Sequence, residues 1–103
     1  MAPIDFQKMR KELISLYEKF LESPDNHLTY NEVVDYHIKF GGLVKYNEYL
    51  KSQPVPKDIV TGLYGLSTIY MYKFYEKDEG IFSNEEIIVT AKRILQDLKK
   101  EDR

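Results

Sequence analysis

Apolar side chains recur every three or four residues near the start of the chain, which is the period of one helix face. The positions that follow this spacing are Phe6, Met9, Leu13, Leu16 and Phe20. The run Ser23-Pro24-Asp25-Asn26 then ends the pattern, because the residue before a proline is pushed out of helical geometry and Asp and Asn favour turns. We therefore predict an amphipathic helix over residues 5–22.

A second helix is predicted to begin at Thr29-Tyr30-Asn31-Glu32, which has the residue types of a capping box. Its predicted apolar stripe consists of Tyr30, Val33, Val34, His37 and Ile38. Gly41-Gly42 interrupts the pattern at a cost of about 1 kcal/mol per glycine relative to alanine, so the helix either ends or bends there. Leu43, Tyr46 and Leu50 resume helical spacing, and we expect a further helical piece to about Ser52.

Pro54-Val55-Pro56 is a stiff connector before a predicted third helix. Pro56 suits the first helical turn, where its missing N–H costs nothing, and Asp58 is favourable beside the positive helix end. Apolar and aromatic residues nearly encircle this helix, which is typical of burial on several sides. Gly62 and Gly65 lie one turn apart, and we interpret them as positions where a neighbouring element packs closely.

Ser83-Asn84-Glu85-Glu86 forms a second capping-box pattern and predicts a last helix. Its buried face is marked at steps of four, three and four by Ile87, Ala91, Ile94 and Leu98. No convincing alternating strand pattern is present. The sequence thus predicts an all-α fold, an antiparallel (up-down-up-down) four-helix bundle that forms one domain over residues 1–103.

Composition sets limits on partners and location. The 103 residues include 15 basic and 17 acidic side chains, so a net charge of −2 gives no overall attraction to nucleic acid. The absence of cysteine excludes disulfides and thiolate metal sites and fits a reducing compartment. The longest apolar stretch, residues 59–71, is too short and interrupted to span a bilayer, and nothing at the start resembles a signal peptide. We expect a cytoplasmic protein with at most peripheral contact at the inner face of the membrane.

Catalytic and metal-binding patterns are not found. A di-iron bundle needs Glu-x-x-His, but Pro24 and Val34 stand three residues before His27 and His37. Serines and threonines lack a nucleophile-elbow context, and Gly41-Gly42 lacks the lysine of a phosphate-binding loop. Two stretches that end in Glu32 and Glu85 resemble the second half of a calcium loop without its first carboxylate. We therefore expect no enzyme activity, no metal and no cofactor.

The candidate partner-binding residues are aromatic and basic. The 14% aromatic content exceeds the needs of a small helical core, and tyrosine is enriched at interfaces. If the third helix is not wholly covered, its recognition residues are Tyr64, Tyr72 and Tyr75. Basic charge gathers on the last helix in Lys92, Arg93, Lys99 and Lys100. Core packing of the tyrosines and helix-dipole compensation by the cations are the structural alternatives.

Three stretches resemble the immunity proteins of pediocin-like (class IIa) bacteriocins, the enterocin A immunity family. They are Glu12-Leu13-Ile14-Ser15-Leu16-Tyr17 leading into Ser23-Pro24-Asp25, Pro54-Val55-Pro56-Lys57-Asp58-Ile59-Val60, and Gly80-Ile81-Phe82-Ser83-Asn84-Glu85-Glu86. Together the stretches lie between about Phe6 and Leu98. Each marks a helix boundary and carries no catalytic signature.

The resemblance implies a non-catalytic cytosolic four-helix bundle that protects a bacterium from a membrane-permeabilising peptide. In that family protection acts through the mannose permease to which the bacteriocin binds, and the C-terminal half determines which bacteriocin is resisted. The resemblance makes Tyr72, Tyr75, Lys92, Arg93, Lys99 and Lys100 expected contacts. The chain departs from the family pattern at Gly41-Gly42 and in ending soon after the fourth helix. A small helical adaptor or inhibitor that binds a cytosolic protein through the third helix is the alternative.

Overall fold

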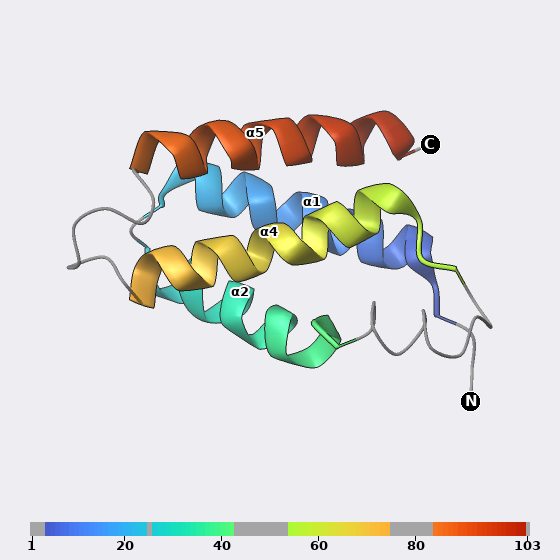
Figure 1. Cartoon of the computed structure of the whole chain (residues 1–103), viewed down its shortest axis with the longest axis horizontal. Helices are drawn as coiled ribbons and strands as arrows, with labels where there is room; N and C mark the ends of the chain where they lie inside the picture. Colours follow the sequence, from blue (N-terminus) through green and yellow to red (C-terminus); the bar gives the residue numbers. More distant parts are fainter. Residues whose placement is uncertain (1–3, 25, 43–53, 75–83, 103) are drawn as a thin grey trace.

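Four helices make up the described part of the chain, and they alternate in direction along one long axis (Figure 1). The computed structural model describes residues 4–24, 26–42, 54–74 and 84–102. Its helices are α1 (Phe6–Glu22), α2 (His27–Phe40), α4 (Lys57–Phe74) and α5 (Asn84–Glu101). The predicted all-α antiparallel four-helix bundle is therefore confirmed.

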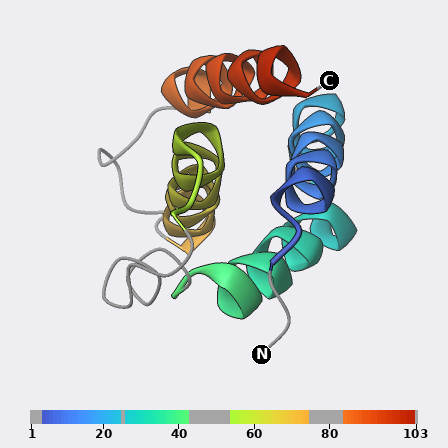
Figure 2. The same ribbon diagram turned by 90° about the vertical axis from the view of Figure 1, so that its right-hand side faces the viewer.

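The helices surround a common core with α2 and α5 on opposite sides (Figure 2). Both α1 and α4 pack against α5 and against α2, and they also contact each other. The two central helices thus have their inner sides covered by three neighbours. Each of the four helices also carries exposed residues.

The core is built mainly from α1, α4 and α5. Its buried apolar residues are Met9, Leu13, Leu16, Tyr17, Phe20, Val33, Ile59, Leu63, Leu66, Ile69, Ile87, Ala91, Ile94 and Leu98. Complete burial of a leucine-sized side chain contributes about 2 kcal/mol relative to exposure. The predicted buried face of the last helix is confirmed in full, and that of the first helix at every position except Phe6, which is half-buried.

Helix α4 approaches α1 closely at its two glycines. A Cβ atom at Gly65 would overlap the Tyr17 hydroxyl and would lie 2.6 Å from Cδ1 of Ile94. At Gly62 it would lie 3.2 Å from Cδ1 of Leu13. The glycines therefore act as packing positions, as the sequence indicated.

A polar network joins three helices at the end of the bundle where α1 and α4 begin and α5 ends (Figure 1). Arg10 donates from Nε and Nη2 to the two carboxylate oxygens of Asp58, at 2.6 and 2.9 Å. Its Nη1 donates to Gln7, whose Nε2 in turn donates to Asp102 at 2.9 Å. The Asp58 carboxylate raises the pKa of the Arg10 guanidinium, although burial opposes the effect. This network fixes the end of α5 against the starts of α1 and α4.

The start of the second helix differs from the prediction. The N-cap is Asn26, whose side chain accepts hydrogen bonds from the backbone N–H groups of Leu28 and Thr29. Thr29 lies inside α2 and is buried, so the predicted capping box at Thr29 is wrong. Asparagine caps a helix at least as well as threonine, and the N-cap lies three residues before the predicted one.

The second helix ends at Phe40, and the Gly41 N–H closes its last turn on the His37 carbonyl at 2.6 Å. Of the predicted apolar stripe, Val33 is buried but Ile38 is 74% exposed, so Ile38 was wrongly assigned to the buried side. The predicted continuation to Ser52 lies outside the described residues.

The opening of the third helix differs from the prediction by one residue. The Pro56 carbonyl accepts from Val60 N–H at 3.0 Å, which makes Pro56 the residue before α4 rather than a residue of its first turn. The carboxylate of Asp58 lies in the first turn of α4, but it pairs with Arg10. The capping box at Ser83 begins outside the described residues.

Candidate functional site

The outward side of α4 is exposed although it carries no charge. From Ile59 to Tyr72 the sequence contains no charged residue. Tyr64 is 56% exposed and Met71 is 41% exposed. These two residues are seven apart, or two helical turns, and so share one side of the helix. We call the outward side that carries Thr61, Tyr64, Thr68 and Met71 the α4 face.

The two threonine hydroxyls on the α4 face are hydrogen-bonded within the helix. Thr61 Oγ1 donates to the Lys57 carbonyl at 3.0 Å, and Thr68 Oγ1 donates to the Tyr64 carbonyl at 3.4 Å. Such bonds to the preceding turn use the hydroxyl donors and leave the methyl groups at the surface. The α4 face is therefore more apolar than its composition alone indicates.

Four cations lie on the outward side of α5 in two rows. Lys99 belongs to the row that faces α1, because its Nζ lies 3.8 Å from a carboxylate oxygen of Glu18. Lys100 lines a hollow with Lys57 and Thr61 of α4. Because Lys92 and Arg93 precede these lysines by seven residues each, they extend the two rows by two turns.

Between the rows lie Val89 and Gln96, and Val89 is 64% exposed. We call this surface the α5 basic face. It consists of Val89, Lys92, Arg93, Gln96, Lys99 and Lys100.

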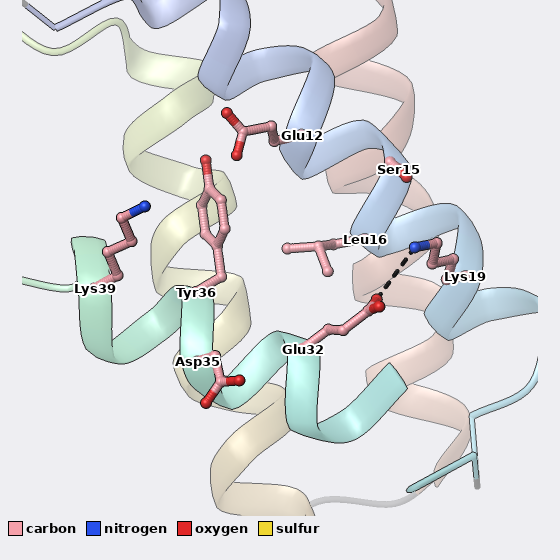
Figure 3. A pocket seen from close by; sticks show the side chains of 8 residues that line it. All are labelled: Glu12, Ser15, Leu16, Lys19, Glu32, Asp35, Tyr36 and Lys39. Carbon is pink, nitrogen blue, oxygen red and sulfur yellow. Dashed lines mark hydrogen bonds and ion pairs between the residues drawn. The ribbon is translucent and has the colours of Figure 1, made fainter. Parts of the chain in front are cut away.

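A groove of about 380 Å³ lies between α1 and α2 (Figure 3). In Figure 3 the Tyr36 side chain points from α2 toward Glu12 of α1. The Tyr36 hydroxyl oxygen is buried and has no hydrogen-bond partner among the described residues. Burial, together with the charge of Glu12, raises the pKa of this hydroxyl. Lys19 and Glu32 form an exposed ion pair of 3.2 Å across the groove. The groove is lined by both acidic and basic side chains, so its charge strongly favours neither an anionic nor a cationic ligand.

The described residues bring one histidine next to a hydroxyl. Nδ1 of His37 lies 3.2 Å from Oγ of Ser67, and its ring stacks on Tyr70 with centroids 6.0 Å apart. Ser67 lies in the middle of α4, where backbone N–H groups are used by the helix and cannot stabilise an oxyanion. We interpret the pair as a contact that joins α2 to α4. No group of three or more potential metal-ligating side chains occurs within residues 4–24, 26–42, 54–74 and 84–102.

The structure places five of the seven predicted binding residues at the surface. Tyr64 lies on the α4 face, and the four predicted cations form most of the α5 basic face. Tyr72 belongs to α4, but its side chain is outside what the structure describes, and Tyr75 lies wholly outside the described residues. Met71 and Val89 were not predicted from the sequence as surface residues of the candidate site. The uncharged run in α4 could have indicated Met71, and the spacing of Val89 from Lys92 and Gln96 could have indicated Val89.

None of the helices in the described ranges is both long enough and apolar enough to cross a bilayer. Comparisons of the chain with protein-family models, curated proteins and solved structures found no match.

Proposed function

We propose that this protein is a bacteriocin immunity protein that binds, without catalysis, to the complex of a pediocin-like peptide and its membrane receptor, the mannose permease. The observation that carries the proposal is the α4 face. It is exposed, uncharged and aromatic, and it lies on the helix whose opening, residues 54–60, contributes to the family resemblance.

An exposed aromatic surface on a rigid helix suits protein recognition. Tyrosine contributes a large contact area at a low entropic cost, because few of its bonds rotate. The inner side of α4 is held by the close contacts of Gly62 and Gly65 with α1 and α5. A surface held in this way loses little conformational freedom on binding, which favours affinity.

The α5 basic face adjoins the same helix and supplies charge to the proposed contact. Lys100 lines a hollow together with Lys57 and Thr61, so cations stand directly beside the α4 face. Charges at the rim of an interface accelerate association and contribute to specificity. Tyr72 and Tyr75, which follow Met71 in the sequence, are proposed to extend the aromatic contact.

A growth-inhibition assay tests the proposal. A sensitive strain that expresses the protein is compared with the same strain carrying an empty vector, against a panel of pediocin-like bacteriocins. We expect selective rescue from one or a few peptides. Folded protein at a measurable level in the cells, with no rescue from any peptide, would contradict the proposal.

A soluble adaptor that uses the same α4 face is the competing explanation. It would give no rescue, and affinity purification would recover one soluble partner without permease subunits. The immunity protein and the adaptor therefore predict opposite results in the growth-inhibition assay and in the affinity purification.

A further inference from the structure

We propose that the α5 basic face docks on an anionic phospholipid bilayer, with the axis of α5 parallel to the membrane surface. We infer this binding partner from the charge of the α5 basic face. Four cations lie on one outward side of a single helix, and the surface of an anionic bilayer attracts such a cluster.

The cations form a continuous surface about three turns long. Residues 89–100 place Lys92 and Lys99 in one row, Arg93 and Lys100 in the other, and Val89 and Gln96 between them. The acidic Asp97 of this stretch is exposed and borders the surface on the side of α4, where it lines a hollow together with Lys100. The carboxylates of Glu85 and Glu86 belong to the first turn of α5, away from the basic half.

The exposed sides of α1 and α2 carry charges of both signs. On α1, exposed Lys8 and Lys11 are followed by Glu18, and on α2, exposed Glu32 and Asp35 precede Lys39. Opposite charges at such spacings cancel at the distance of a membrane surface. Among the described helices, α5 thus presents the most consistently basic side.

The position of α5 allows docking without any change of fold. In Figures 1 and 2 the helix lies along one border of the bundle, with α2 on the opposite border. Helix α2, which carries the acidic residues Glu32 and Asp35, would therefore lie on the side of the bundle farther from the membrane. The ion pair of Lys99 with Glu18 is about half exposed and weak, so it does not withdraw Lys99 from lipid.

Val89 adds an apolar contact to the charged surface. Its side chain is 64% exposed, although valine is usually a buried residue. Lysine stems can lie along the headgroup region while their ammonium groups contact phosphate. A basic helix side with an apolar residue between the cations is typical of interfacial helices.

This inference does not rest on the proposed function, because a lipid vesicle contains neither bacteriocin nor permease. The test is flotation of the purified protein with equimolar phosphatidylglycerol and phosphatidylcholine vesicles, compared with phosphatidylcholine vesicles. We expect binding to the anionic vesicles only, and weaker binding at high salt. Each cation contributes about fivefold to the partition constant, so the double variant Lys92→Gln/Lys99→Gln should bind roughly 25-fold more weakly.

A matched variant separates the surface from net charge. Lys8→Gln/Lys11→Gln removes two exposed cations from α1 and changes the net charge equally. It should retain binding. An equal loss in both variants, equal binding to both kinds of vesicle, no vesicle binding, or binding to RNA but not to vesicles would each overturn the inference. Circular dichroism of every variant verifies that the helices are intact.

Discussion

The hydroxyl of Tyr17 donates a hydrogen bond to the backbone carbonyl of Gly62, at 2.6 Å, in the interior of the bundle. Gly65 lies one turn further along α4, where a side chain would overlap that hydroxyl. The position of the Tyr17 phenol thus depends on two glycines of α4: Gly62 accepts its hydrogen bond, and Gly65 leaves room for its hydroxyl. This contact sets how closely the two central helices approach, and it orients the α4 face toward solvent.

Substitution of Gly65 by alanine should destabilise the protein. The added methyl group would force apart Tyr17 and Ile94, and overpacking of this kind costs about 1–3 kcal/mol. Gly62→Ala is the matched control, because its methyl group would lie 3.2 Å from the movable Leu13 side chain and at an ordinary contact distance of 3.7 Å from Leu98. Alanine gains about 1 kcal/mol of helix propensity over glycine, which should leave Gly62→Ala near neutral. Urea denaturation of both variants measures the difference; equal stability in the two would contradict the packing account.

The two phenols of Tyr17 and Tyr36 should respond differently to loss of the hydroxyl. Tyr17→Phe removes a buried hydrogen bond and should cost about 1 kcal/mol. Tyr36→Phe removes a buried hydroxyl that has no hydrogen-bond partner in the part of the chain that the structure describes, so its effect should be neutral or slightly stabilising. The free energies of unfolding of the two variants provide the comparison, and a greater loss in Tyr36→Phe would refute it.

Stability should fall in alkaline solution. Burial raises the pKa of both phenols above their ordinary value of 10.0, and Glu12 adds to the effect at Tyr36. As the pH rises past 10.0, the unfolded state loses phenol protons that the folded state keeps, so unfolding becomes more favourable. The double variant Tyr17→Phe/Tyr36→Phe should show a flatter pH dependence above pH 10.0 than the unsubstituted protein. Denaturation midpoints measured across this range test the expectation, and identical slopes would count against it.

The Arg10–Asp58 pair should matter much more than the Lys19–Glu32 pair. Side chains of the first pair are only 10% and 8% exposed, and they are joined by two hydrogen bonds. Asp58→Asn would leave a largely buried guanidinium without its counter-charge, and we expect a loss of about 3 kcal/mol. Lys19→Gln breaks a pair that is about half exposed and should cost less than ~0.5 kcal/mol. Thermal denaturation should separate the two variants clearly, and a similar melting temperature would show that the network contributes little.

Helix faces were predictable because their period is local. Ile87, Ala91, Ile94 and Leu98 reveal their common side by spacing alone, and all four are buried. The start of α2 was harder, because Asn26 and Thr29 both suit an N-cap and only the hydrogen bonds to Asn26 decide between them. The local spacing of apolar residues also does not show that only part of the apolar stripe of α2 faces the core. For this reason the exposure of Ile38 could not be predicted from the sequence.

Contacts between distant residues were not predictable. Arg10 and Asp58 are 48 positions apart, and their pairing requires the starts of α1 and α4 to lie at the same end of the bundle. Of the candidate site, residue types were foreseeable but exposure was not. The encircling apolar residues of the third helix indicated burial on several sides, whereas one side with Tyr64 and Met71 remains open because no described helix covers it.

The proposed function is tested most directly by affinity purification from membranes of sensitive cells treated with the bacteriocin against which the protein protects. We predict recovery of the mannose permease with the unsubstituted protein and a strong loss of recovery with Tyr64→Ser. Leu28→Ser, which alters an exposed apolar residue of α2, should retain it. A failure of the unsubstituted protein to recover permease, or equal recovery with Tyr64→Ser, would contradict binding through the α4 face.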